Sequence, residues 1–324
     1  MKLEPLRLEP QLVHRIWGAR SLAPLFPKKQ NLAEPVGEAW LTGNECRIAN
    51  GDLAGRALGE AWRAMPAAIA GTRMDRQKPF PLLVKFLFPE DILSIQVHPD
   101  DEYARKHEAA TGWSGKTEAW HVLAARDGAY VRVGLLPEVT PELFRQAIAD
   151  GSAERCLRHL PVECGDTIFV PAGTVHTIGP GVVLCEVQEN SDLTYRVFDY
   201  NRTDASGKPR ELHVEKALAV TRFGEQLGGK MPRQRKEQPG MIETKCVECP
   251  YFSVERWDFA VAAQRAPAPE RFELLVTLDG RGSLHWRDGR FDYERGQLWM
   301  IPAALGEYRI DPAQPTSLLR TLVP

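Results

Sequence analysis

The sequence of 324 residues has little net charge, few cysteines and no apolar run long enough to cross a bilayer. Its 41 lysines and arginines nearly balance its 43 aspartates and glutamates, which gives a formal net charge of -2. This balance provides no electrostatic reason to expect binding to nucleic acid or to a membrane. We therefore expect the partner to be a small molecule.

Residues 1–18 contain charged side chains among their apolar ones, so we expect no signal-peptide core there and a cytoplasmic protein. Six cysteines are too dilute for a disulfide scaffold, and a reducing compartment would keep them as thiols. The single CxxC motif, Cys246 to Cys249, has no second pair of ligands nearby. It is not expected to hold a structural zinc ion.

Many short runs rich in β-forming residues, each ended by Gly, Pro or Asp, predict a mainly β fold of the sandwich or barrel type. Helices are expected to be few and short. The clearest begins after the capping residue Thr140, has Pro141 in its first turn and ends near Gly151, and two others are predicted over 100–110 and 215–220. The predicted strands cover 82–87, 92–97, 129–133, 167–170, 182–187, 272–278 and 297–301.

Two related halves are predicted from a linker and a repeat. Residues 226–239 are polar and punctuated by Gly and Pro, so they are interpreted as a linker between modules 1–225 and 240–324. Residues 165–176 align without gaps on 296–307, since both have a turn glycine, a mostly apolar strand and then Pro-Ala. This duplication is a hypothesis. The alignment places Glu307 opposite His176, so only the first half is expected to hold a metal.

The pattern Gly165-x5-Pro171-x-Gly173-x2-His176 resembles the second sequence motif of the cupin family, and every defining position is present. Gly165 permits a turn before a barrel strand. Pro171 and Gly173 then bend the chain, so that His176 enters the barrel on the next strand. The alternative interpretation is a hydrogen-bonded histidine of the core or of a turn.

Polar residues inside β-prone runs indicate a metal site. Gln96 and His98 are two residues apart on a strand and share a face, and burying both is costly unless they are hydrogen-bonded or bind something. Glu118 adds a carboxylate. With His176, these residues form a mixed N/O set that suits Zn²⁺ and would also accept Mn²⁺, Fe²⁺ or Co²⁺. Lys116 shares the strand face of Glu118, although a surface lysine is the alternative.

Several motifs in order resemble the type I mannose-6-phosphate isomerase family, in its compact bacterial form. The similarity covers roughly residues 15–220 and is weaker in the C-terminal half. Only 58 residues separate Glu118 from His176, which leaves room for a short helix but not for a large inserted helical domain. The motifs are Trp17-Gly18, Gly37–Trp40, Pro79–Leu87, Gln96–Pro99, Gly115–Trp120 and Tyr195–Tyr200.

The resemblance implies two cupin (jelly-roll β-barrel) modules, the first catalytic and the second metal-free. It implies one zinc ion per chain, with Arg196 as the active-site arginine and Lys116 as a site lysine that binds phosphate or steers protons. The implied substrate is a small sugar phosphate of carbohydrate metabolism, and the chain is expected to be a monomer or a homodimer. The implied zinc ligands are Gln96, His98, Glu118 and His176.

The implied reaction interconverts mannose 6-phosphate and fructose 6-phosphate through an enediol, whose charge the metal and Arg196 would stabilise. The sequence leaves the proton carrier open among Lys116, Glu186, Asp199 and a metal-bound hydroxide. Three alternatives remain: a related sugar or sugar-phosphate isomerase of different specificity, a cupin oxygenase, and a non-catalytic sugar-binding cupin.

Overall fold

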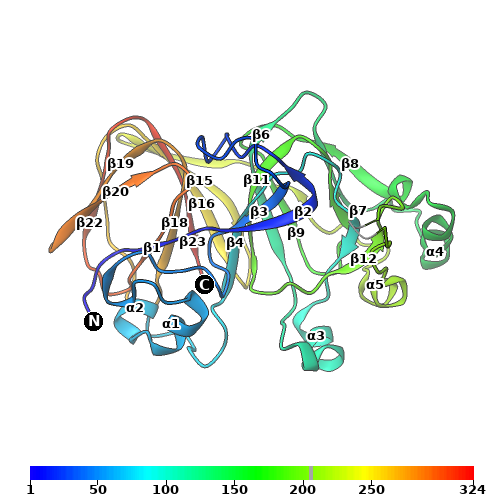
Figure 1. The fold of residues 1–324 in the computed structure, drawn as a ribbon, viewed down its shortest axis with the longest axis horizontal. Coiled ribbons are helices and arrows are strands. Elements are labelled where there is room, and N and C mark those ends of the chain that lie inside the picture. The colour runs from blue at the N-terminus through cyan, green and yellow to red at the C-terminus, as the bar shows by residue number, and fades with distance from the viewer. Residues whose placement is uncertain (204–206) are drawn as a thin grey trace.

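The computed structural model describes residues 1–203 and 207–324 and confirms the predicted mainly β fold. Its strands form four antiparallel sheets, which group into two modules of two sheets each (Figure 1). Within the described residues, no strand ladder joins the two sheets of a module into one closed barrel. None of the described helices is both long and apolar enough to cross a membrane.

The first module pairs a seven-stranded sheet with a five-stranded one. The larger sheet has the order β13 (Gly229–Lys230), β9 (Thr167–Val170), β6 (Glu118–Ala125), β11 (Val182–Glu189), β4 (Leu82–Leu87), β3 (Val36–Trp40) and β2 (Gln11–Ala19). The smaller sheet has the order β12 (Tyr195–Phe198), β5 (Ile95–Val97), β10 (His176–Ile178), β7 (Tyr130–Leu135) and β8 (Leu157–Pro161).

The second module pairs a seven-stranded sheet with a four-stranded one. The larger sheet has the order β1 (Leu6–Leu8), β21 (Leu298–Ile301), β18 (Glu273–Asp279), β23 (Thr316–Leu322), β16 (Ser253–Phe259), β15 (Met241–Glu248) and β14 (Gln234–Gln238). The smaller sheet has the order β17 (Ala263–Arg265), β22 (Tyr308–Pro312), β19 (Arg281–Trp286) and β20 (Gly289–Glu294).

Apart from β12, which has no counterpart among the described strands of the second module, the strand orders of the two modules correspond one to one, which supports the duplication hypothesis. In chain order, β2 to β11 occupy the same sheet positions as β14 to β23. The strand that precedes each set is exchanged: β1 joins the large sheet of the second module, and β13 joins that of the first. Figure 1 shows the blue β1 among the orange and red strands of the second module. The exchange ties each module to the other.

The segment 226–239, interpreted as a linker, contains β13 and β14. β14 is an edge strand whose side chains are largely exposed, and it is held by backbone pairing with β15. An edge strand of this kind needs no apolar alternation, so its sequence resembles a connector. The division into 1–225 and 240–324 remains a prediction, although β1, which belongs to 1–225 in sequence, pairs with β21 of the second module.

The gapless alignment of 165–176 on 296–307 is wrong by one residue at its end. Glu307 is exposed, whereas Tyr308 is buried and begins β22 as His176 begins β10. The turn after Pro302 is therefore one residue longer than the turn after Pro171. The inward position that corresponds to His176 belongs to Tyr308.

The helices are short and lie outside the sheets: α1 (Leu58–Ala64) and α2 (Ala67–Ala70) beside the second module, and α3 (Asp101–His107), α4 (Pro141–Asp150) and α5 (Val214–Val220) around the first (Figure 1). The described residues also form three short 3₁₀ helices, η1 (Gly51–Leu53), η2 (Ala109–Thr111) and η3 (Ala153–Cys156). α4 begins as predicted, because the Thr140 hydroxyl accepts a hydrogen bond from the Leu143 N–H at 3.2 Å.

The seven predicted strands all exist, with ends shifted by up to three residues. Residues 82–87 and 167–170 match β4 and β9, whereas β5 begins only at Ile95 rather than at 92. The helices predicted over 100–110 and 215–220 correspond to α3 and α5.

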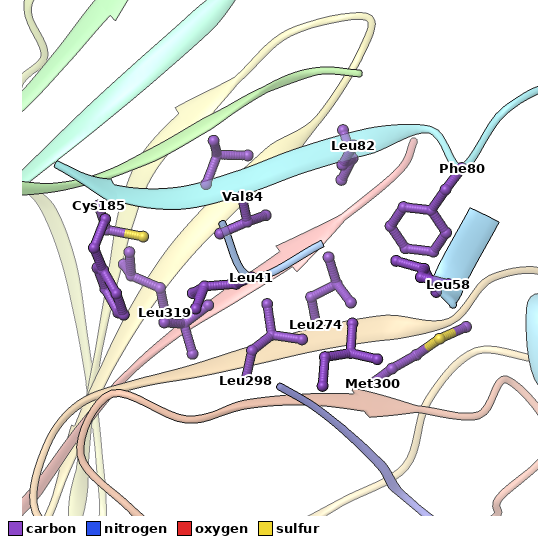
Figure 2. Packing of buried hydrophobic residues seen from close by; sticks show 14 of the residues in the cluster. Leu41, Leu58, Phe80, Leu82, Val84, Cys185, Leu274, Leu298, Met300 and Leu319 are labelled. Atoms are coloured by element: carbon purple, nitrogen blue, oxygen red, sulfur yellow. The ribbon is translucent and has the colours of Figure 1, made fainter. Parts of the chain in front are cut away.

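The two large sheets pack face to face and share one apolar core. Figure 2 shows Leu82 and Val84 of β4 facing Leu274, Leu298 and Leu319 of the second module. Because alternate residues of a strand point to opposite faces, the residues between them point into the first module. Both faces of β4 are buried, which explains its nearly continuous apolar sequence and makes a lysine in it conspicuous.

Candidate metal centre

The structure brings three of the four expected ligands together inside the first module. Glu118 begins β6, His176 begins β10 and His98 directly follows β5, and all three are buried. Their candidate ligand atoms lie within 4.8 Å of one another. Oε1 of Glu118 is 3.3 Å from Nε2 of His176, and its Oε2 is 3.6 Å from Nε2 of His98.

Backbone carbonyls fix the orientation of both imidazoles. Nδ1 of His98 donates to the Leu193 carbonyl at 2.9 Å, and Nδ1 of His176 donates to the Thr174 carbonyl at 2.8 Å. Since a carbonyl only accepts, the proton sits on Nδ1 and the Nε2 lone pair is left for a metal.

Burial keeps both imidazoles neutral. Burial, followed by the charge of Lys116, lowers the pKa of His98 well below its usual value. Burial also lowers the pKa of His176 to about 4. Neutral imidazole is the form that binds a metal, so the two histidines are ready to bind at neutral pH.

The fourth expected ligand, Gln96, stands beside the cluster. Its backbone pairs directly with that of His176, and its Nε2 lies 3.2 Å from Nε2 of the same residue. An amide nitrogen donates, so a ligand role requires a half-turn of the amide that presents Oε1 instead. The position fits, and the exchange of oxygen for nitrogen needs no backbone movement.

The donor set suits a cation. Oε2 of Glu118 is buried without a well-directed hydrogen bond. The ammonium group of Lys116 lies 2.6 Å from this oxygen and 3.0 Å from Nε2 of His98, so the cluster already attracts one positive charge. Two imidazoles, a carboxylate and an amide oxygen match the ligands of a divalent metal with open positions.

The cluster opens into a cavity of about 470 Å³ in which charges alternate. From the metal end outward, Lys116 lies 3.7 Å from Glu186, and Glu186 lies 3.2 Å from Lys85. Lys85 lies 3.9 Å from Glu38, which pairs with Arg15 at 3.1 Å. A larger hollow of about 820 Å³, beside Arg20 and Arg126, has no such cluster and is an open surface feature.

The buried charges shift one another's ionisation. Burial and the Glu118 carboxylate raise the pKa of Glu186 to about 7. For Glu38, burial alone would raise the pKa, but the positive charges of Lys85 and Arg15 lower it to about 2. Glu186 is thus a carboxyl group in the cavity that can gain and lose a proton near neutrality, the property required of a general base.

Sequence reasoning assigned no role to Lys85 or Glu38. The signal for Lys85 was present, because a lysine in the middle of the apolar run 82–87 must be buried and needs a partner. That partner is Glu186 on the neighbouring strand β11, directly opposite in register. Glu38 is joined to the cavity only by tertiary contacts, which local sequence does not reveal.

Arg196 lies on β12, directly opposite Gln96 of β5, and lines the cavity. It donates to the Glu211 carbonyl at 2.9 Å. Neither Asp199 nor Glu186 pairs with it; within residues 1–203 and 207–324, no carboxylate lies within ion-pair distance of its guanidinium. Asp199 accepts instead from Arg202 and Arg210.

Comparisons with known proteins cover nearly the whole chain. Residues 6–119 match the family model of the type I phosphomannose isomerase catalytic domain, and residues 242–314 match the mannose-6-phosphate isomerase cupin domain. Mannose-6-phosphate isomerase ManA of Bacillus subtilis is 34% identical over 96% of this chain and 97% of its own. The mannose-6-phosphate isomerase of Streptococcus mutans is 33% identical over 95% of each. A crystal structure of the Bacillus subtilis mannose 6-phosphate isomerase superposes with a TM-score of 0.89 at 31% identity, covering 98% of this chain and 99% of that one.

Proposed function

We propose that this chain, which belongs to the type I phosphomannose isomerase family, interconverts mannose 6-phosphate and fructose 6-phosphate. The relatives confirm the predicted family, the isomerase class and the cupin fold. The observation that carries the proposed reaction is the buried His98–Glu118–His176 cluster at the end of a cavity lined by Lys85 and Glu186.

The residues fit one divalent ion, for which we propose zinc, held by Gln96, His98, Glu118 and His176. Both imidazoles present Nε2 to Glu118, which supports this ligand set. A divalent ion held there would polarise the oxygens on carbons 1 and 2 of the sugar and stabilise negative charge on them.

Isomerisation moves a proton between carbon 2 and carbon 1. Glu186 and Lys116 lie at the metal end of the cavity, 3.7 Å apart, where the reacting carbons would bind. With a pKa near 7, Glu186 can accept the proton from one carbon and return it to the other, while Lys116 holds that carboxylate in place. Arg196 can donate to a developing oxyanion.

Asp199 is a poorer proton carrier than Glu186. Burial raises its pKa, but hydrogen bonds from Arg210 and Arg202 more than offset this effect and lower it overall. A carboxylate held by two arginines is not free to take up a proton at neutral pH. We therefore assign the proton transfer to Glu186, with Lys116 holding its carboxylate in place.

We further propose a cytoplasmic location, a role in carbohydrate metabolism, and a monomeric or homodimeric state. Cell fractionation tests the location, and sedimentation measures the oligomeric state.

The function is tested by a coupled assay of mannose 6-phosphate against free mannose, with metal analysis of the same sample. We expect turnover of the phosphorylated sugar and one divalent ion per chain. Preference for free mannose would support a related specificity. Fe²⁺-dependent consumption of O₂ without isomerisation would support an oxygenase, and sugar binding without turnover a non-catalytic cupin.

A further inference from the structure

Residues 114–117 lead into β6, so their backbone determines where the side chains of Lys116 and Glu118 enter the cavity. The described strand pairing of β6 begins only at Glu118, which stands opposite Val170 on one side and Gln188 on the other. Before that point the buried backbone needs other hydrogen-bond partners, because buried N–H and C=O groups rarely remain unpaired. Two carboxyl groups supply them.

These carboxyl groups belong to Asp101 and Glu189. Oδ1 of Asp101 accepts a hydrogen bond from the Gly115 N–H at 2.8 Å, and Oε1 of Glu189 accepts one from the Thr117 N–H at 2.7 Å. The Glu189 N–H donates in turn to the Thr117 carbonyl at 3.1 Å. The two side chains therefore hold the backbone on both sides of Lys116.

Glu189 holds this segment from outside the cavity. Along β11 it shares a face with Cys185 and Val187, which lie in the core between the two modules (Figure 2). Glu186 points to the opposite face and lines the cavity, whereas Glu189 is buried and does not line it. Any effect of Glu189 on the reacting groups must therefore pass through Thr117 and the residues next to it.

Glu189 can share a proton with Asp101. Burial raises the pKa of Glu189 to about 7; the hydrogen bond from Thr117 acts against this effect, and the charge of Asp101 adds to it. A protonated carboxyl group keeps one oxygen as an acceptor for the Thr117 N–H and can donate through the other oxygen to Asp101. The hydrogen bond to Thr117 is thus available in both protonation states.

The second module comes close to this carboxyl pair. Cys249 and Tyr251 lie in the turn between β15 and β16, and both pack against the shared core. Burial raises the pKa of Cys249, and the charge of Glu189 adds to this effect. Burial and the charge of Glu189 also raise the pKa of Tyr251 to about 12. This turn therefore helps to enclose Glu189 without bringing a positive charge to it.

We propose that Glu189, together with Asp101, is a positioning residue that fixes Lys116 and Glu118 at the metal end of the cavity through the backbone that leads into β6. The ammonium group of Lys116 lies 2.6 Å from Glu118 and 3.0 Å from His98, so a shift of this backbone would move it relative to the metal ligands. The inference rests on the proposed function, because it takes these side chains as the groups that bind the metal and act on the sugar.

The test uses Glu189→Ala in the full-length protein. Affinity for Zn²⁺, measured by competition with a chelator, should weaken about tenfold, as for loss of a residue that orients a metal ligand. With Zn²⁺ in excess, kcat for mannose 6-phosphate should fall about tenfold with little change in KM, because Lys116 and Glu118 act where charge develops in the transition state. Glu189→Gln keeps an acceptor for the Thr117 N–H and a donor to Asp101, so it should restore both values.

Asp101→Ala is the second variant, because Asp101 is exposed and its loss should not prevent folding. It should change Zn²⁺ affinity and kcat in the same direction by a smaller factor. Glu4→Ala is the matched control: Glu4 and Glu189 are both 6% exposed, and Glu4 pairs with Lys2 beside β1, outside the cavity. It should lower the melting temperature and leave Zn²⁺ affinity and kcat unchanged.

Unchanged Zn²⁺ affinity and kcat in folded Glu189→Ala would overturn the positioning role even if the wild-type protein isomerises mannose 6-phosphate. Zn²⁺ affinity that depends on Glu189 in a wild-type protein without isomerase activity would refute the proposed function and retain the positioning role. If Glu189→Ala does not fold, the comparison of Asp101→Ala with Glu4→Ala decides: equal Zn²⁺ affinity and equal kcat in the two variants would overturn the proposal.

Discussion

The two modules share one strand order but place different chemistry inside it. Glu118 stands opposite Val170, the last residue of β9, and Glu273 stands opposite Ile301, the last residue of β21. The two glutamates therefore occupy the same position, and both are buried. In the first module this carboxylate faces two imidazoles and a cavity, whereas in the second it is closed off by protein partners.

Those partners replace the residues of the metal centre. By register, Arg320 of β23 stands where Glu186 stands on β11, and it contacts Glu273 at 2.5 Å and Glu255 at 3.1 Å. Tyr308 takes the inward position of His176 and donates to Glu273 at 3.0 Å.

An internal guanidinium thus supplies the positive charge that a metal would supply in the first module. The Arg320 guanidinium also lies 5.3 Å from the ring centre of Trp257, in a cation–π contact. The cupin scaffold thus positions the carboxylate, while two or three side chains decide whether it meets a metal or an arginine.

The largest expected effect tests the metal site of the first module. In His98→Ala plus His176→Ala protein, metal affinity should fall by orders of magnitude, because two of the proposed ligands are lost. Metal analysis after dialysis measures this. His285→Ala, in the second module, is the control and should retain one ion per chain. Full occupancy in the double variant would remove the proposed site.

The second-largest expected effect concerns Arg320, the arginine that takes the place of Glu186 in the second module. Arg320→Met leaves Glu273 buried with only Tyr308 as a partner, so the free energy of unfolding should fall by about 3–5 kcal/mol. Metal content should not change. Chemical denaturation measures the loss, and adding Glu273→Gln should restore part of it by removing the buried charge. A variant as stable as the wild type would show that Arg320 does not hold this network together.

The third expected effect concerns β12, a strand of the first module. Among the described strands, β12 has no counterpart beside β17, and it carries Arg196. Arg196→Ala should lower kcat by roughly 10²-fold or more, as for loss of an oxyanion donor, with metal content and melting temperature near the wild-type values. Arg196→Lys should recover only part, because it lacks the planar fork. Near-normal kcat in the folded, metal-loaded variant would leave Arg196 a structural residue.

The face to which each side chain of a regular strand points is predictable from the sequence, because successive side chains alternate between the two faces. The sequence alone places Gln96, His98 and Glu118 on inward faces, and it does the same for Lys116. The Pro–Gly turn indicates that His176 also points inward. The sequence pattern of a single strand does not show which strands lie side by side, so it cannot show which of these inward side chains come together.

The missed features depend on distant contacts or on loop length. Arg210 follows β12 in a segment without strand pattern, and only its pair with Asp199 shows that it returns to the cavity. One extra residue in a turn moves the inward position from Glu307 to Tyr308. The sequence of β14 resembles a linker because an exposed edge strand has no apolar period.

The smallest expected effect concerns α4, which connects β7 to β8 in the first module, whereas only two residues connect β19 to β20 in the second. The hydroxyl of Thr140 caps the first turn of α4, so Thr140→Ala should lower the free energy of unfolding by about 1 kcal/mol. Thr140→Ser keeps the hydroxyl and should restore most of it. Because α4 does not line the cavity, metal content and kcat should stay at wild-type values in both variants. A fall in kcat at full metal occupancy would show that this insertion supports the site as well as the module, and would extend the difference between the two modules beyond their interiors.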